Sequence, residues 1–153
     1  MAFLFAPILS LLLICNAWAQ RPSEESMCDN LDVDFLEFSV EKSTMFFQES
    51  NRRKENNEQK SAAYLMKSAV DSIQSAYQQS SGYIFGCVNI FVDKEGRILP
   101  NLTIDDSDLS VLSGEQEIAD RQYDHAFRSF HTAWMSRTGT IKEAITEYLK
   151  RKH

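Results

Sequence analysis

The chain has 153 residues, of which 43% are hydrophobic and 25% are charged, and its net charge at pH 7 is −6. This length and apolar content are sufficient for one domain with a real core. The acidic balance argues against DNA or an anionic membrane surface as the main partner.

The first nineteen residues have the pattern of a secretory signal peptide. Residues 2–14 are almost wholly apolar, and Ala17-Trp18-Ala19 supplies the small residues that signal peptidase requires. A membrane anchor fits less well, because the apolar run is short, is interrupted by Pro7 and is followed by acidic residues. We therefore expect residues 1–19 to be removed and residues 20–153 to form one secreted helical domain.

Two cysteines, Cys28 and Cys87, remain once Cys15 leaves with the signal peptide. In an oxidising compartment two such cysteines pair with each other more readily than they stay free. The chain-entropy model allows roughly 4 kcal/mol of stabilisation for a bridge that closes a loop of this length. A metal site is disfavoured, because no further ligand pattern accompanies the two cysteines.

Residues 29–49 are predicted to form a helix, although part of the segment also alternates like a strand. The apolar stripe expected on this helix consists of Leu31, Phe35, Phe38, Met45 and Phe46. The following run, 51–57, contains no apolar residue. It is either a surface connection or an exposed helix end, where its cations favour the C-terminal end of the helix dipole.

The strongest helical pattern covers residues 57–82. Its stripe contains Ala62, Met66, Ala69, Val70, Ile73, Ala76 and Tyr77, and Gly82 is predicted to end the helix in a left-handed conformation. The apolar run that follows is either a short buried helix or part of a β-hairpin over residues 83–99. We favour the helix, because an isolated two-stranded ribbon is marginally stable.

The C-terminal third is predicted to contain a loop over residues 100–110 and then two helices. A capping box begins at Ser113 and precedes an apolar stripe that runs to Trp134. After Gly139, a second box at Thr140 opens the last helix, which closes on Lys150-Arg151-Lys152. The fold class predicted overall is an all-α bundle of four or five helices with one disulfide.

No motif for a nucleophile, a phosphate loop or a zinc site is present. His125 and His131 are six residues apart and do not share a helix face. The acidic run that ends at Asp108 resembles a calcium loop, but it has Val111 where the sharp turn needs glycine. We therefore expect no enzymatic activity, metal or cofactor. The sequon Asn101-Leu102-Thr103 predicts N-glycosylation of Asn101.

The overall layout resembles the anophensin and albicin family of mosquito salivary proteins. The similarity covers the uncharged leader, the cysteine staple, the aromatic segment RQYDHAFRSFHTAWMSRTGT and the basic tail IKEAITEYLKRKH. The resemblance implies an all-helical, non-enzymatic protein that is injected into a vertebrate host. It further implies action on plasma cascades, either the alternative complement pathway or contact activation with kinin release.

The leading hypothesis is a salivary inhibitor that binds complement convertase components or contact-phase factors, with no nucleic-acid or membrane partner. Because charge complementarity speeds encounter with acidic plasma proteins, exposed cations are the expected contacts. They are Arg52, Arg53, Lys150, Arg151 and Lys152.

Two alternatives come from other classes of protein. The first is a carrier of a small apolar ligand, with aromatic stripes lining an internal cavity. The simpler expectation is that these aromatics fill the core, because protein interiors are densely packed. They are Phe35, Phe38, Phe127, Phe130 and Trp134. The second alternative is a helical-bundle ligand of the cytokine type.

Overall fold

The computed structural model describes residues 28–88 and 106–153. Four predictions fall partly or wholly outside these residues: the signal peptide, residues 89–99 of the segment 83–99, residues 100–105 of the loop 100–110 and the sequon at Asn101. The described elements are α3 (Val33–Glu55), α4 (Gln59–Ser72), α5 (Gln74–Tyr83), the π-helical turn η1 (Ile84–Val88), α6 (Asp106–Ala119) and α7 (Tyr123–Lys152). The described residues contain five α-helices and no strand, so the all-α prediction is confirmed.

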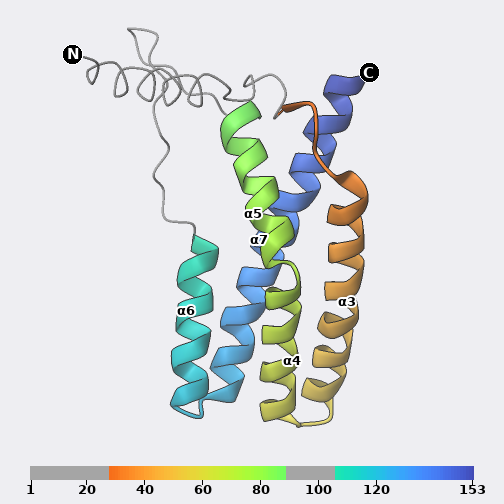
Figure 1. Cartoon of the computed structure of the whole chain (residues 1–153). Coiled ribbons are helices and arrows are strands. Elements are labelled where there is room, and N and C mark those ends of the chain that lie inside the picture. The colour runs from red at the N-terminus through yellow and green to blue at the C-terminus, as the bar shows by residue number, and fades with distance from the viewer. Residues whose placement is uncertain (1–27, 89–105) are drawn as a thin grey trace, which may run out of the picture. The chain divides into compact units, whose positions relative to one another are not determined.

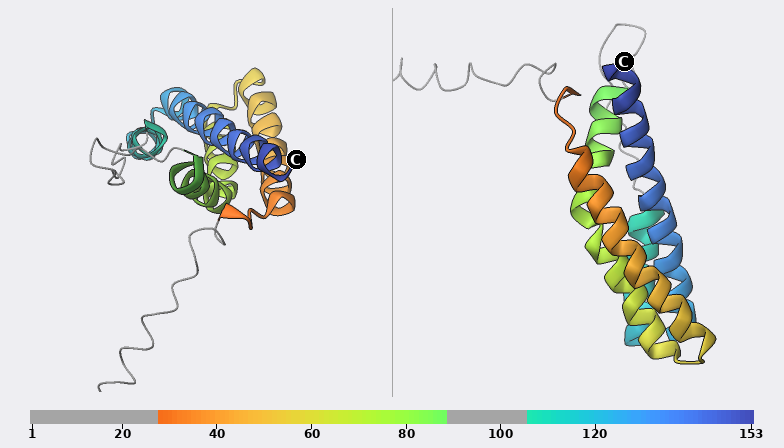
Figure 2. Two further views of the ribbon diagram at one scale, coloured as in Figure 1. Left: turned by 90° about the horizontal axis from the view of Figure 1, so that it is seen from above. Right: turned by 90° about the vertical axis from the view of Figure 1, so that its right-hand side faces the viewer.

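The predicted disulfide is also confirmed, since Cys28 and Cys87 are bonded to each other. All five α-helices, α3 to α7, belong to one compact unit, Leu31–His153. Within that unit α3 and α4 run antiparallel, and α7 extends along the full length of the bundle (Figures 1 and 2). α6 packs beside the first half of α7 and α5 beside its second half (Figure 1).

The contact between α3 and α4 is built from small side chains. Ser39, Ser43 and Ser50 are buried on α3, and Ala62, Ala63 and Ala69 are buried on α4. The Ser43 hydroxyl accepts a hydrogen bond of 3.1 Å from Trp134 Nε1 of α7, so this face of α3 also meets α7. The Ser50 hydroxyl donates a hydrogen bond to the Ala62 carbonyl oxygen at 2.7 Å, across the two helices. Small residues let the two backbones approach closely, and the hydrogen bond compensates for burying the hydroxyl.

The predicted buried stripe of α3 is therefore wrong in part. The exposed fraction is 39% for Phe35, 64% for Phe38 and 68% for Met45. At about 100° per residue, Phe38 and Met45 are each turned by about 140–160° from the buried Ser43. The serine face meets α4 through Ser50 and α7 through Ser43, so these apolar side chains point outward. Leu31 and Leu36 are the apolar residues of this region that are buried.

The run after this stripe is the end of α3, as one of the two interpretations of residues 51–57 expected. Arg52, Arg53 and Lys54 occupy the last helical turn. Asn57 then adopts a left-handed conformation with φ 61°. The Asn57 N–H donates to the Lys54 carbonyl, and the Glu58 N–H donates to the Arg53 carbonyl. These bonds satisfy carbonyl groups at the end of the helix, and the chain reverses there.

The central helical segment is two helices rather than one. Ile73 leaves the helical conformation with φ −102° and ψ 1°, and its N–H bonds to the Val70 carbonyl three residues earlier. Gly82 has no left-handed conformation and lies inside α5, so the prediction that it ends the helix is wrong. The chain continues through η1, which confirms a helix over a hairpin for the described residues 84–88.

The predicted boundaries in the C-terminal third are wrong in three places. α6 begins at Asp106, inside the expected loop, and passes through Ser113, where a helix start was expected. The chain then reverses at Arg121, which has φ 59°, so the stripe that runs to Trp134 is divided between two helices. α7 continues through Gly139, and the Thr140 hydroxyl donates to the Ser136 carbonyl instead of capping a new helix.

The core of the bundle lies where α7 meets α4, α5 and α6. It contains Ala62, Ala63, Met66, Ala69, Val70, Ile73 and Ala76 from the α4–α5 segment, and Ala126, Phe127, Phe130, Ala133, Trp134, Ile141 and Ala144 from α7. The buried stripe predicted for the α4–α5 segment is thus confirmed, although its helix boundaries were not. The stripe predicted for the C-terminal segment is confirmed in part, because Ala119 and Leu149, which were also expected inside, are exposed.

Candidate interaction surface

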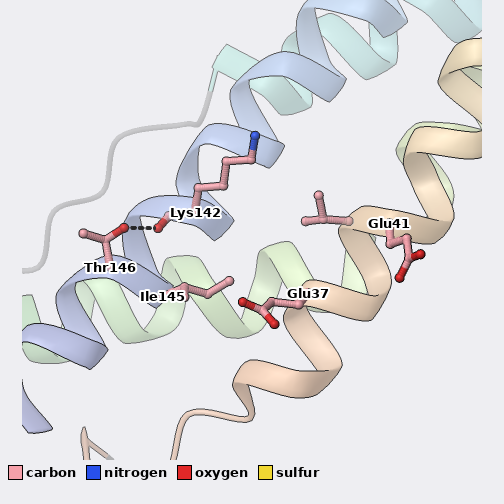
Figure 3. A pocket seen from close by; sticks show the side chains of 6 residues that line it. Glu37, Glu41, Lys142, Ile145 and Thr146 are labelled. Atoms are coloured by element: carbon pink, nitrogen blue, oxygen red, sulfur yellow. Dashed lines mark hydrogen bonds between the residues drawn. The ribbon is translucent and has the colours of Figure 1, made fainter.

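A groove opens between α3 and α7 on the surface of the bundle. We call it the α3–α7 groove; it is lined by Glu37, Val40 and Glu41 from α3 and by Lys142, Ile145 and Thr146 from α7. Its volume is about 460 Å³. Figure 3 shows Glu37 and Ile145 pointing toward one another across it, with the ammonium group of Lys142 directed away. The Thr146 hydroxyl donates to the Lys142 carbonyl, so it is already satisfied within α7.

Two carboxylates mark the α3 side of this groove. Glu37 and Glu41 are four residues apart on one helix face, an arrangement of like charges that destabilises an isolated helix by a few tenths of a kcal/mol. In the part of the chain that the structure describes, neither carboxylate takes part in an ion pair. A cationic group from a partner would relieve this repulsion.

Exposed apolar side chains flank both sides of the groove. On α3, Phe38 and Met45 lie three and four residues from Glu41 and are therefore its neighbours on the helix surface. On α7, Leu149 follows Ile145 by four residues and is 45% exposed. The groove and its edges thus combine apolar surface with charge, a composition typical of interaction sites.

The five cations that the sequence singled out lie in two groups rather than one patch. Arg52 and Arg53 end α3, next to the point where the Lys54 ammonium lies 3.5 Å from the Asp124 carboxylate at the start of α7. Lys150 lies 26 residues further along α7, which at 1.5 Å per residue is about 39 Å away. The two groups occupy opposite ends of the bundle (Figure 1).

Local interactions already engage these cations. The Arg52 guanidinium pairs with Glu49 at 2.6 Å, and Arg53 pairs with Glu49 and Glu58. Near the other end, the Lys150 ammonium lies 2.6 Å from the Glu147 carboxylate. Arg151 donates to the Cys87 carbonyl in η1, and Lys152 lies over the Tyr148 ring at 5.1 Å. These contacts give each cation a role in the bundle itself.

Asp108 belongs to the acidic run that superficially resembled a calcium loop, and its observed partner is an arginine. Its carboxylate accepts a hydrogen bond from Arg137 at 2.6 Å. The same guanidinium donates to Ser107 and Gln74 and lies 5.0 Å from the Tyr77 ring centroid. Ser107 and Asp108 therefore connect α6 with α7 through Arg137, and Arg137 in turn contacts α5.

The two internal histidines lie in different surroundings, as their spacing predicted. The His131 ring lies between Phe47 and Phe127, with centroid distances of 5.5 and 6.1 Å. The His125 Nδ1 atom lies 3.3 Å from the Gln122 Oε1 atom. Among residues 28–88 and 106–153, no group of three or more histidine, cysteine or acidic residues is placed to hold a metal ion.

Sequence reasoning missed the α3–α7 groove because it assigned Phe35 and Phe38 to the core. A second set of residues on α3 also recurs at helical spacing, and it would have indicated the buried face correctly. It consists of Ser39, Ser43 and Ser50, at spacings of four and seven residues. Small residues that recur at helical spacing can indicate a buried helix face, just as large apolar residues do. Had this face been placed inside, Phe38 and Met45 would have been predicted outside.

The described part of the chain is thus an all-α protein with an apolar groove between two of its helices. No protein-family model, curated protein or solved structure matches the chain. None of the described helices is both long enough and apolar enough to cross a membrane.

Proposed function

We propose that this protein is a secreted, non-catalytic inhibitor that binds proteins of host plasma cascades, with the alternative complement pathway as the first target. The observation that carries the proposal is the α3–α7 groove with Phe38, Met45 and Leu149 exposed along its edges. A cluster of large apolar side chains beside charges is a favourable surface for a protein partner. The resemblance to anophensin and albicin supplies the class of partner.

The shape of the groove suits the side chains of a protein partner. Val40 and Ile145 supply the apolar part of its lining, and Glu37, which points toward Ile145 across the groove, makes no ion pair with the described residues (Figure 3). A partner segment that carries a cation next to an apolar residue would satisfy both features. Such an inhibitor acts by covering a surface of its target.

The test is lysis of rabbit erythrocytes by human serum in which calcium is chelated and magnesium is supplied, so that only the alternative pathway operates. We expect dose-dependent protection at submicromolar concentrations of the folded protein. Lysis that is unchanged by the added protein would reject the complement assignment. Contact activation would then become the leading target, and the assay for it measures kallikrein generation in plasma.

A matched pair of variants tests whether the groove is the contact. Leu149→Glu places a charge at the edge of the groove, and we expect it to reduce protection at least tenfold. Met135→Glu makes the same change at a residue of α7 that is 54% exposed and lies about 21 Å further down the helix, and we expect little effect. Equal loss in both variants would contradict the groove as the site.

The carrier alternative receives less support than protein binding. Phe127, Phe130 and Trp134 are buried within the core, and the α3–α7 groove is lined by no aromatic residue. Mass spectrometry of a lipid extract of the purified protein checks this alternative. A ligand bound in stoichiometric amount would favour the carrier over the inhibitor.

Secretion is part of the same proposal, supported by the signal-peptide pattern and by the disulfide. Expression of the full chain in insect cells tests it. We expect the protein in the medium with its N-terminus at Gln20, and with a mass increase at Asn101 that peptide N-glycosidase removes.

A further inference from the structure

The outer face of α3 carries a short sequence that is complementary to itself. Residues 38–45 read Phe-Ser-Val-Glu-Lys-Ser-Thr-Met, with an apolar residue at each end and an acid next to a base in the centre. On a helix, Phe38, Glu41, Lys42 and Met45 occupy neighbouring positions on one face. All four are exposed, and the exposed fraction is 64% for Phe38 and 68% for Met45.

A strip ordered apolar, acidic, basic, apolar matches a second copy of itself that runs in the opposite direction. A two-fold axis between positions 41 and 42 places Glu41 of each copy against Lys42 of the other. The same axis places Phe38 against Met45 of the second copy. Every favourable contact then occurs twice, which is the property that defines a two-fold symmetric interface.

The charges of this strip are available for such a contact. Over residues 28–88 and 106–153, neither Glu41 nor Lys42 takes part in an ion pair. Further from the axis, Asp34 would approach Glu49 of the second copy. That carboxylate is already held by Arg52 at 2.6 Å and by Arg53 at 2.7 Å, so little repulsion is expected.

From this pattern we propose that the protein forms a two-fold symmetric dimer in which the outer faces of α3, Phe38-Glu41-Lys42-Met45, pack antiparallel. The interface uses one helix from each copy and is therefore smaller than the roughly 800 Å² per partner of a typical stable complex. We expect a weak dimer with a dissociation constant on the order of 10–100 µM. The dimer does not depend on the proposed function. It covers Phe38, Glu41 and Met45, which the proposed function assigns to a plasma partner, so the two contacts exclude each other on one molecule. With this dissociation constant the protein is monomeric at the submicromolar concentrations of the lysis test, and the surface is then free for the partner.

Sedimentation equilibrium of the mature protein between about 1 and 300 µM tests this proposal. We expect the wild-type protein to dimerise in the range given above. Glu41→Lys and Lys42→Glu should each weaken the dimer at least tenfold, because each variant brings two pairs of like charges together. Glu143→Lys is the control: this exposed carboxylate on α7 makes no ion pair with the described residues, and its reversal should leave the dimer unchanged.

The decisive measurement is an equimolar mixture of the two single variants. In the mixed dimer every lysine faces a glutamate, so association should return to within about threefold of the wild-type value. The double variant Glu41→Lys/Lys42→Glu should recover it in the same way. Recovery would also show that both single variants are folded. If one of them loses its helical circular dichroism, Phe38→Ser takes its place and should weaken the dimer at least tenfold.

Three results would overturn the proposal. The first is a wild-type protein that remains monomeric over the whole concentration range. The second is a dimer that none of the variants at positions 38, 41 and 42 weakens, which would place the interface on another face. The third is a mixture of folded single variants that does not associate, which would exclude the antiparallel pairing.

Discussion

The guanidinium of Arg137, in the middle of α7, donates a hydrogen bond of 2.6 Å to the carboxylate of Asp108, in the first turn of α6. Arg137 is only 3% exposed, whereas the Asp108 side chain is 55% exposed. The arginine also donates to Gln74, the first residue of α5. One buried cation thus joins three helices at the level where α4 gives way to α5.

Replacing Asp108 by Asn should destabilise the fold by about 1–2 kcal/mol, because a buried guanidinium loses its charged acceptor. Arg137→Ala should cost more, about 2–4 kcal/mol, since packing against Tyr77 is lost as well. Urea unfolding followed by circular dichroism measures both changes. The pair is coupled only if the double variant costs less than the sum of the two, and strict additivity would contradict the contact.

Gly114 and Gly139 provide a matched comparison of two helical glycines. A Cβ at Gly114 would lie 2.8 Å from the ring of the fully buried Phe130, whereas a Cβ at Gly139 meets nothing within 4 Å. We expect Gly114→Ala to destabilise the protein by about 1–3 kcal/mol through overpacking. Gly139→Ala should stabilise it by about 0.5–1 kcal/mol through helix propensity. Thermal unfolding decides the signs, and equal effects would contradict the close packing of α6 on α7.

Arg121 closes α6 in a left-handed conformation that ordinary side chains adopt at a cost. Its side chain is exposed and makes no ion pair with the described residues, so replacement loses no contact. Arg121→Gly should therefore stabilise the protein by about 0.5–1 kcal/mol. Asn57→Gly is the control: asparagine tolerates this conformation, so the gain there should be smaller. Chemical denaturation gives both values, and a loss of stability in Arg121→Gly would refute this account.

Hydrogen bonds from Arg52 and then Arg53 lower the pKa of Glu49 from 4.5 to about 2. A carboxyl whose pKa is lower in the folded protein stabilises the fold above its unfolded pKa, and this contribution is lost as the pH falls from about 4.5 toward 2. We expect an NMR titration of the Glu49 carboxyl to show a midpoint near 2. In Arg52→Gln/Arg53→Gln the midpoint should move back toward 4.5. A midpoint near 4.5 in the wild-type protein would rule out these hydrogen bonds in solution.

The sequence by itself determined the helical class, the single disulfide and the buried stripes of α4 and α7. Apolar residues such as Met66 and Phe130 recur there at helical spacing. The cysteine pair followed from counting, because the chain has three cysteines and Cys15 lies in the predicted signal peptide. The helical stripes depend on patterns within one segment, and such patterns can be recognised in a sequence.

The tertiary structure alone decided which face of α3 is buried and where α6 turns into α7. α3 has two periodic faces, one of serines and one containing Phe38 and Met45. Packing against α4 and α7 selects the serine face, where Ser50 bonds to Ala62 and Ser43 accepts from Trp134. In the same way, Gly114 accommodates Phe130, and Arg137 finds Asp108, only after the chain reverses at Arg121. Periodicity within one helix identifies stripes, but the neighbouring helix determines which stripe it covers.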